Sequence, residues 1–389
     1  MNKLAFTQVS IDGFRGLKKL QLDQLGPLNI LVGENNSGKT SVLEAISVLC
    51  RPYDPYEWLA MVRRRDFGQL DETRVQSLRW CFSQTGDLVD PDFMYVGKCS
   101  FQCQGAFPVR GLEVDYQDVV AEPSERDIER LNRQRNRTGE YSDIERLWRG
   151  AQIIHHIWDE SQPFDHPADP IIIQIWEEDR MSGVRSRTSS RRSNLDIPVE
   201  MLTPYSYQLN RLQVSSHSQQ LLFPFLEEYK IRRQSIIELV REFDPDVIDI
   251  NVASFRGGRP AIYISHKRLG PAPLSVFGDA LRRAVLLAST IQKLSGGVLL
   301  IDEIETGIHV TALKKVFAWL VKAASRFDVQ IIATTHSLEA VDAVCESVNE
   351  HVDDLVTFHI NQSDETTKVK RIAGEMLLRL RRERGLDVR

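Results

Sequence analysis

Residues 29–41 read NILVGENNSGKTS, an apolar run that breaks at Gly33 into a polar loop and resumes at Ser41 as the helical pattern SVLEAISVL. This order predicts a strand, a glycine-containing loop and a helix, which is the context that a phosphate-binding loop requires. The loop fits the pattern G-x-x-x-x-G-K-[ST] at every position. The residues that we expect to bind the nucleotide are Gly33, Glu34, Asn35, Asn36, Ser37, Gly38, Lys39, Thr40 and Ser41.

The side chains of this loop have distinct physical roles. Gly33 and Gly38 allow the backbone to turn tightly, so that successive N–H groups and the helix N-terminus point at a polyphosphate. We expect the ammonium group of Lys39 to reach the β- and γ-phosphates and the Thr40 hydroxyl to bind Mg²⁺. The predicted cofactors are therefore ATP and Mg²⁺.

The composition indicates a soluble, globular chain of 389 residues, with 42% hydrophobic and 26% charged side chains. Lys and Arg number 49 against 54 Asp and Glu, so the net charge of −5 gives no general reason to expect a nucleic-acid partner. The five cysteines include no C-x-x-C pair, which favours a reduced, cytoplasmic protein without a disulfide or zinc framework. No apolar run is long enough to span a membrane, and the N-terminus lacks a signal-peptide core.

The chain divides into three predicted segments. Residues 1–121 are expected to hold the phosphate loop and a β-rich lobe. Residues 122–243 read as a charged, mainly helical insertion. Residues 244–389 then resume the nucleotide-binding domain and end in a basic helix.

Local patterns predict the elements within these segments. Alternating hydrophobicity predicts strands over residues 4–10, 18–23, 77–83, 93–103 and 109–119. Helical patterns cover 124–158 and 205–243, and the arginines at 63–65 are expected on a solvated helix face. His155 and His156 are adjacent, so they cannot share a helix face as metal ligands, and a core or surface role is favoured. Residues 180–193 carry five arginines and no acid, which leaves two interpretations open: a solubilising loop, or one that grips phosphates.

The second half of the chain contributes two acids and a histidine at strand ends. Residues 298–301 are apolar and are followed by Asp302 and Glu303, a pattern typical of a buried parallel strand that delivers carboxylates to the edge of a sheet. We expect Asp302 to hold Mg²⁺ and Glu303 to polarise the attacking water. The next strand, over 329–336, ends in His336, which we expect to sense or position the γ-phosphate. Glu303, His336 and Lys39 are the predicted catalytic residues.

The order of the stretches GENNSGKT, LSVFGDALRR, LLIDEIETGIH and ATTHS resembles the ABC-type ATPase heads of the OLD, RecF and SMC group, particularly the OLD-like AAA ATPases of bacterial defence operons. This resemblance implies an α/β fold, an ABC-ATPase head in which a parallel sheet carrying the phosphate loop is flanked by an antiparallel β lobe. It also implies a homodimer, or a higher multiple of dimers, in which Ser275 and Gly278 of one head complete the ATP site of the other. The stretch departs from the LSGGQ form of transporter ATPases, which argues against transport. The family's Mg²⁺-sensing glutamine falls on either Gln69 or Gln84.

Full OLD proteins carry a C-terminal TOPRIM nuclease, and the residues after the last ATPase strand are too few for one. The resemblance therefore predicts that any nuclease is a separate chain. The basic helix with Arg379, Arg381, Arg382 and Arg384 is open to three interpretations: contact with nucleic acid, contact with an acidic partner, or a solvated helix end.

Three functional hypotheses follow. The first is an ATPase of an anti-phage defence system that controls a separate nuclease effector and responds to a phage protein or nucleic acid. The second is a RecF-like repair ATPase that clamps DNA, and the third is a nucleotide-gated scaffold with little hydrolysis.

Overall fold

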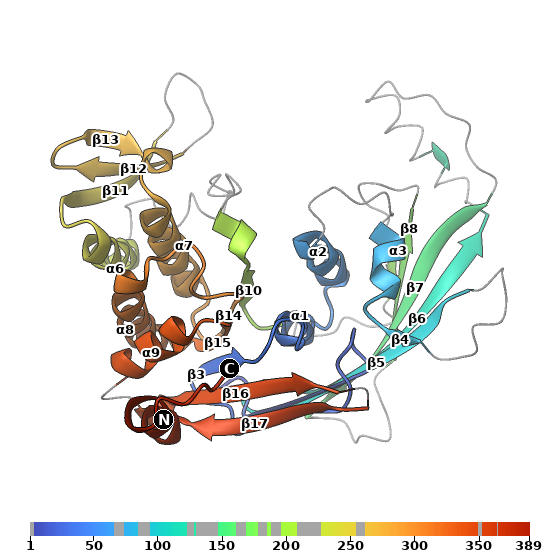
Figure 1. Ribbon diagram of the computed structural model, residues 1–389. Coiled ribbons are helices and arrows are strands. Elements are labelled where there is room, and N and C mark those ends of the chain that lie inside the picture. The colour runs from blue at the N-terminus through green and yellow to red at the C-terminus, as the bar shows by residue number, and fades with distance from the viewer. Residues whose placement is uncertain are drawn as a thin grey trace.

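The computed structural model describes residues 4–65, 74–84, 94–122, 128–129, 147–160, 169–177, 185–187, 196–207, 227–253, 261–348, 352–363 and 365–389. Three sheets and the helices around them make up this part of the chain (Figure 1). The arginine-rich stretch 180–193 lies outside it, apart from the backbone of β9 (Arg185–Arg187).

A six-stranded sheet forms the centre and carries the phosphate loop. Its strands, in spatial order, are β10 (Val199–Leu202), β14 (Val298–Ile301), β15 (Gln330–Thr334), β3 (Leu28–Val32), β16 (Leu355–Gln362) and β17 (Thr367–Ala373). The first five are mutually parallel, and β17 joins antiparallel at the edge. Every residue of β3, β14 and β15 is buried, which explains why their sequences are almost continuously apolar.

Successive residues of these strands alternate between two hydrophobic cores. Leu300 and Ile332 face α1 (Lys39–Cys50) on one side of the sheet. Leu299 and Ile331 face the helices of the other side, which are α7 (Asp279–Lys293), α8 (Val310–Phe327) and α9 (Leu338–Ser347). The sheet is thus covered on both faces, with α1 and α8 on opposite sides (Figure 1). This arrangement confirms the predicted α/β core and brings the carboxyl ends of β3, β14 and β15 to one edge.

An antiparallel sheet packs beyond α1, as the resemblance implied. Its strands are β2 (Leu20–Asp23), β1 (Gln8–Asp12), β5 (Val96–Gln104), β6 (Val109–Ala121), β7 (Trp148–Asp159), β8 (Ile171–Trp176) and β9, with β4 (Ser83–Gln84) paired to β5. The predictions for 93–103 and 109–119 are confirmed. The strand predicted over 77–83 is wrong for most of its length, because α3 (Arg74–Arg79) precedes the two-residue β4.

The middle of the chain is not mainly helical where it is described. Residues 148–159, predicted to be helical, form the strand β7, which pairs antiparallel with β6 and β8. The segment IIHHIW alternates between buried and partly exposed side chains, and its isoleucines suit a pleated surface. The helical prediction is confirmed for α6 (Glu227–Phe243), and the three-part division of the chain stays a prediction.

The two histidines of β7 follow that alternation. His155 is buried, where its Nε2 accepts a hydrogen bond from Trp58 Nε1 at 3.0 Å and its Nδ1 lies 2.9 Å from the Pro52 carbonyl oxygen. His156 is on the other face, 3.3 Å from an Asp115 carboxylate oxygen. Their predicted core and surface roles are confirmed.

A third, smaller sheet stands over the N-terminus of α7 (Figure 1). It consists of β11 (Val247–Ala253), β12 (Ala261–His266) and β13 (Gly270–Pro273), which pair antiparallel and pack on α6 and α7. A 3₁₀ turn (Leu274–Val276) connects β13 to α7.

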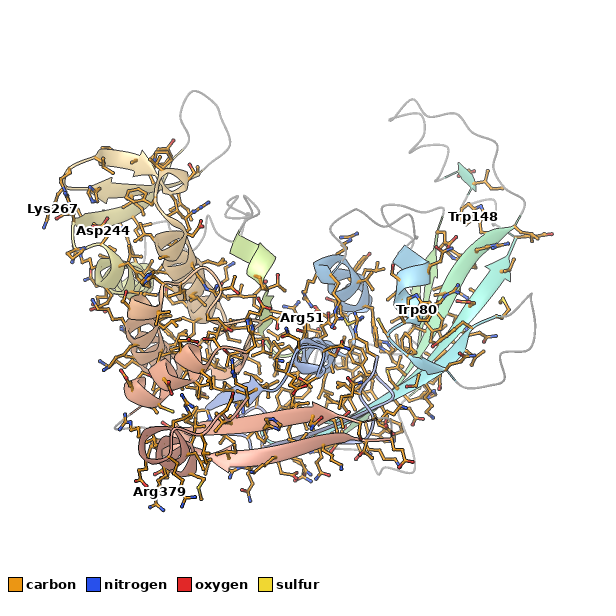
Figure 2. The ribbon with its side chains drawn as sticks, in the orientation of Figure 1. Arg51, Trp80, Trp148, Asp244, Lys267 and Arg379 are labelled. Carbon is orange, nitrogen blue, oxygen red and sulfur yellow. The ribbon has the colours of Figure 1, made fainter. Side chains whose placement is uncertain are left out.

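The basic C-terminal helix is partly neutralised by the domain itself. It comprises α10 (Gly374–Leu378) and a π-helical turn (Arg379–Glu383). Arg381 pairs with Asp342 of α9 through two nitrogens at 2.7 and 2.8 Å, and Arg382 donates to the Cys345 carbonyl at 3.2 Å. Arg379 and Arg384 are exposed (Figure 2 shows Arg379 pointing outward).

Among the described residues, no helix is both long enough and apolar enough to cross a membrane.

Candidate functional site

The phosphate loop turns sharply between β3 and α1. Gly33, Asn36 and Gly38 have φ angles of 149°, 65° and 90°, the region that glycine and asparagine tolerate best. A Cβ atom on Gly33 would lie 2.4 Å from the Ile360 carbonyl oxygen, and one on Gly38 would lie 2.7 Å from a methyl group of Leu17. Both glycines are therefore required by close packing as well as by backbone conformation.

Lys39 lies within the loop, where its Nζ donates hydrogen bonds to the Gly33 carbonyl at 2.8 Å and the Glu34 carbonyl at 2.7 Å. Burial lowers the pKa of its ammonium group, while Asp302 and two other nearby acids act in the opposite direction. The ammonium is thus held at the loop. An anionic phosphate there would stabilise the charged form of Lys39, which burial destabilises.

The end of β14 places Asp302 opposite the first turn of α1. Thr40 Oγ1 donates to the Asp302 carboxylate, with distances of 3.0 and 3.1 Å to its two oxygens, and Thr334 Oγ1 donates to Oδ1 at 2.7 Å. Burial raises the pKa of Asp302, and the hydrogen bonds from Thr334 and Thr40 oppose that shift. A hydroxyl and a carboxylate at this separation are hard oxygen donors of the kind Mg²⁺ prefers, and a divalent cation would offset the desolvation of the acid. The residues present therefore fit an Mg²⁺ ion.

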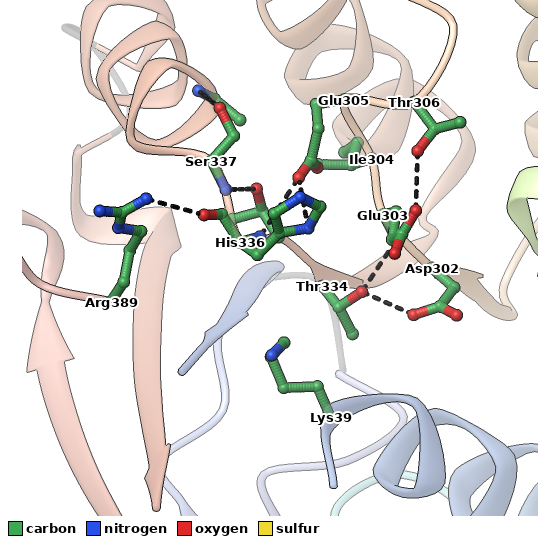
Figure 3. A network of polar contacts seen from close by, with 12 residues as sticks. Lys39, Asp302, Glu303, Ile304, Glu305, Thr306, Thr334, His336, Ser337 and Arg389 are labelled. Carbon is green, nitrogen blue, oxygen red and sulfur yellow. Dashed lines mark hydrogen bonds and ion pairs between the residues drawn. The ribbon is translucent and has the colours of Figure 1, made fainter. Parts of the chain in front are cut away.

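Glu303 follows directly and adopts a left-handed backbone conformation with φ of 48°. Its N–H donates to Thr334 Oγ1 at 2.9 Å, and its carboxylate accepts from Thr306 Oγ1 at 3.0 Å (Figure 3). Its carbonyl oxygen accepts from Arg283 Nη2 at 3.1 Å. Several contacts thus fix the residue that we predicted to polarise water.

His336 stands at the end of β15, on the same edge. Its Nδ1 lies 3.2 Å from Glu305 Oε1, which also accepts from the His336 N–H at 3.2 Å (Figure 3). Arg389 Nη1 donates to the His336 carbonyl at 3.3 Å. Glu305 thereby orients the imidazole and leaves Nε2 as the ring nitrogen free to face a ligand.

Two clefts meet along the phosphate loop. The first, of about 470 Å³, is lined by residues 35–41, Arg65, Asp302, Glu303 and 334–336. The second, of about 540 Å³, is lined by Gly16, Lys18, residues 34–37 and 359–363. Since both share Asn35, Asn36 and Ser37, they form a continuous surface on either side of the loop.

Some predicted residues lie elsewhere. Ser275 and Gly278 are exposed, at the turn before α7, and do not line either cleft. Gln84 is half-buried in β4 and is also absent from both linings, whereas Gln69 lies outside the described residues. The choice between the two glutamines therefore stays open.

Sequence reasoning missed Thr334 and did not predict that Arg65 lines the first cleft. Arg65, from α2 (Pro55–Arg65), lines the first cleft, where its guanidinium donates to the Ser41 hydroxyl at 3.1 Å and to both Glu44 carboxylate oxygens at 2.8 and 2.9 Å. Arg65 is nevertheless exposed, with 43% of its side chain accessible, so the solvated-face prediction is confirmed for this arginine, and only its place beside the cleft was not predicted. The only sequence signal for Thr334 was its place two residues before His336.

Comparison with known families gives two matches. The model of the family described as "AAA domain, putative AbiEii toxin, Type IV TA system" matches residues 122–342. A second, described as "AAA ATPase domain", matches residues 6–94, which include the phosphate loop.

Similar curated proteins match over short stretches. The uncharacterized protein MJECL10 of Methanocaldococcus jannaschii is 45% identical over 40 residues, which are 10% of this chain and 18% of that protein. The DNA replication and repair protein RecF of Teredinibacter turnerae is 31% identical over 88 residues, 21% of this chain and 23% of that protein. The chain thus spans less than a quarter of the length of either relative.

Solved structures with a similar chain trace include SMC heads. The Smc head with an extended coiled coil, bound to the C-terminal domain of ScpA from Pyrococcus furiosus, aligns with a TM-score of 0.47 and 12% identity, over 97% of this chain and 98% of that chain. The SMC head domain from Thermotoga maritima aligns with a TM-score of 0.42 and 10% identity, over 95% of this chain and 99% of that chain.

Proposed function

We propose that this protein hydrolyses Mg-ATP between two copies of itself. The chain belongs to the family described as "AAA domain, putative AbiEii toxin, Type IV TA system". It is an ATPase of the AAA/ABC class related to RecF and SMC heads. One observation carries the proposal. The phosphate loop, the Asp302–Thr40 pair and Glu303 come from distant parts of the chain and face a single cleft.

The geometry supports a division of labour within this cleft. Lys39 and the loop N–H groups would bind the β- and γ-phosphates, while Thr40 and Asp302 would hold Mg²⁺, whose positive charge would stabilise the negatively charged phosphates. Glu303 orients the attacking water and accepts its proton, and His336, braced by Glu305, contacts the γ-phosphate through Nε2. The second cleft, on the far side of residues 35–37, is where the ribose and base fit.

The exposed position of Ser275 and Gly278 supports a shared site. Both are outside the clefts of their own head, so they are available to cap the nucleotide of a second head. ATP would then hold two heads together, and hydrolysis would release them.

For the biological process, we propose a defence role in which this ATPase regulates a separately encoded nuclease effector. The description of the family as a toxin component and the resemblance to OLD-like ATPases support this role. The match to RecF favours a second candidate, a DNA-clamping repair ATPase, which predicts ATP-dependent DNA binding with a steep dependence on salt.

Two variants test the proposal. Lys39→Ala is expected to abolish ATP binding, whereas Glu303→Gln is expected to keep ATP bound, trap the dimer and lower kcat by about 100-fold or more. Mass photometry with Mg-ATP measures the dimer, first alone and then with the product of the neighbouring gene or with DNA.

A Glu303→Gln protein that stays monomeric would refute the shared site, and capture of DNA without the neighbouring protein would favour the repair role. ATP turnover at the parent rate in both variants would refute the site assignment, and turnover near zero in the parent itself would favour the scaffold.

A further inference from the structure

Among the residues that the structure describes, Arg283 is the second largest fully buried side chain, with 1% of its surface exposed. It lies on α7, and its Nη2 donates to two consecutive carbonyl oxygens, those of Glu303 at 3.1 Å and Ile304 at 2.7 Å. A buried guanidinium is unfavourable unless it is hydrogen-bonded, so this arginine and the loop after β14 constrain each other.

The loop needs such a constraint at Glu303. A residue other than glycine is strained at a positive φ, and Glu303 has a φ of 48°. Thr334 holds its N–H, and Arg283 holds its carbonyl oxygen, so both peptide groups that flank the residue are fixed by buried side chains. Arg283 differs from Thr334 in one respect, since it belongs to a helix that begins at the exposed turn with Ser275 and Gly278, which we call the signature turn.

The packing of α7 makes this connection direct. Gly278 is the residue before the first turn of α7, and Arg283 follows five positions later in the same helix. Leu281 and Ala284 pack on the small sheet, whereas Leu287 packs on the central sheet. A shift at the start of α7 would therefore move the small sheet and the Arg283 guanidinium together, relative to the central sheet.

We propose that Arg283 is a positioning residue that couples the two ATP sites of the dimer. When Ser275 and Gly278 of one head contact the nucleotide held by the other head, α7 carries that contact through Arg283 to the Glu303 of its own head. Each site would then hydrolyse fastest when its own signature turn is engaged. This inference rests on the shared-site function proposed above.

The test uses mixed dimers of full-length chains, isolated with two different affinity tags, in which only one head hydrolyses ATP. The partner head carries either Glu303→Gln, which offers bound ATP to the signature turn of the active head, or Lys39→Ala, which offers none. Both partners supply an intact signature turn to the active site, so the ratio of the two turnover rates isolates the coupling. We expect a ratio of about fivefold or more with an unmodified active head.

Arg283→Lys in the active head is expected to bring the ratio to one, because the lysine side chain is shorter and its ammonium group stops short of the position that Arg283 Nη2 occupies between the two carbonyls. Arg282→Lys is the matched control, since Arg282 is on the same helix, pairs with Asp279 and, among the described residues, makes no hydrogen bond to residues 303–306. It should leave the ratio unchanged. Thermal melting identifies any variant that fails to fold.

Ser275→Arg in the active head provides an independent arm that leaves Arg283 in place. It blocks engagement of the signature turn and should also bring the ratio to one. A ratio of one in the unmodified dimer, or a ratio that survives Arg283→Lys, would overturn the coupling while leaving the shared site intact. If unmodified heads formed no ATP-dependent dimer, both the shared site and the coupling would be wrong.

Discussion

Thr334→Val should lower the unfolding free energy and weaken the metal site, whereas the same substitution at Thr357 should do neither. Both threonines are buried in the central sheet. Thr334 is 1% exposed at the end of β15, and Thr357 is 0% exposed in β16. The hydroxyl of Thr334 donates to the Asp302 carboxylate and accepts from the Glu303 N–H. The hydroxyl of Thr357 has no hydrogen-bond partner among the described residues.

The two sites therefore differ in what valine removes. At Thr334 it removes a hydrogen bond to a charged group and leaves a backbone N–H without its acceptor, and together these losses amount to about 3 kcal/mol of unfolding free energy. At Thr357 it replaces a buried, unpaired hydroxyl with a methyl group, which should raise the unfolding free energy by up to about 1 kcal/mol.

Urea unfolding of the nucleotide-free proteins at neutral pH measures this difference. A titration of Mg²⁺ in the presence of ATP measures the functional consequence, because loss of the Thr334 hydrogen bond raises the pKa of Asp302 further and weakens the metal site. We expect Thr334→Val to need several times more Mg²⁺ for half-maximal turnover, and Thr357→Val to match the parent. Equal stability of the two variants would refute the role assigned to Thr334.

Two further predictions concern the core and the phosphate loop. Burial lowers the pKa of His155 to about 4. The unfolding free energy is therefore highest above the unfolded pKa of about 6.5 and decreases by up to about 3 kcal/mol as the pH falls toward 4. Urea unfolding at a series of pH values should show a smaller decrease for His155→Gln, and an unchanged decrease would contradict the assignment. Gly33→Ala should abolish ATP binding and lower the unfolding free energy by about 2 kcal/mol or more, because the added Cβ meets the Ile360 carbonyl. Gly278→Ala is its control for stability, since nothing lies within 4 Å of the added atom, and equal melting temperatures for the two variants would count against the clash.

The sequence was sufficient to predict that the phosphate loop, the acid pair and His336 meet at one edge of the sheet. Parallel strands end at one edge of a sheet, so a phosphate loop after β3, an acid pair after β14 and a histidine after β15 must converge once the three strands are neighbours. The structure adds only the order of those strands, with β15 between β14 and β3.

The sequence was insufficient where tertiary contacts decide. The IIHHIW segment of β7 is compatible with a helix or a strand, and pairing with β6 and β8 selects the strand. Arg65 stands in a run of three arginines and is singled out only because Glu44 and Ser41 of α1 lie beneath it. The contact between Arg283 and Glu303 is likewise a tertiary contact, between a helix and a loop. The spacing of apolar residues along the sequence does not predict such a contact.

These two kinds of residue have different consequences for how the site works. The residues that the sequence identifies, such as Lys39 and Asp302, are the ones that we propose to bind the nucleotide and its metal, and each would act within one head. The residues that only the structure identifies, Thr334 and Arg283, hold the backbone of Glu303 from its two sides. Thr334 belongs to the central sheet, but Arg283 belongs to the helix that begins at the exposed turn with Ser275 and Gly278. If the proposed coupling holds, the position of Glu303 depends on one contact fixed by the sheet and one that dimerisation would move, which would make hydrolysis a property of the assembled pair.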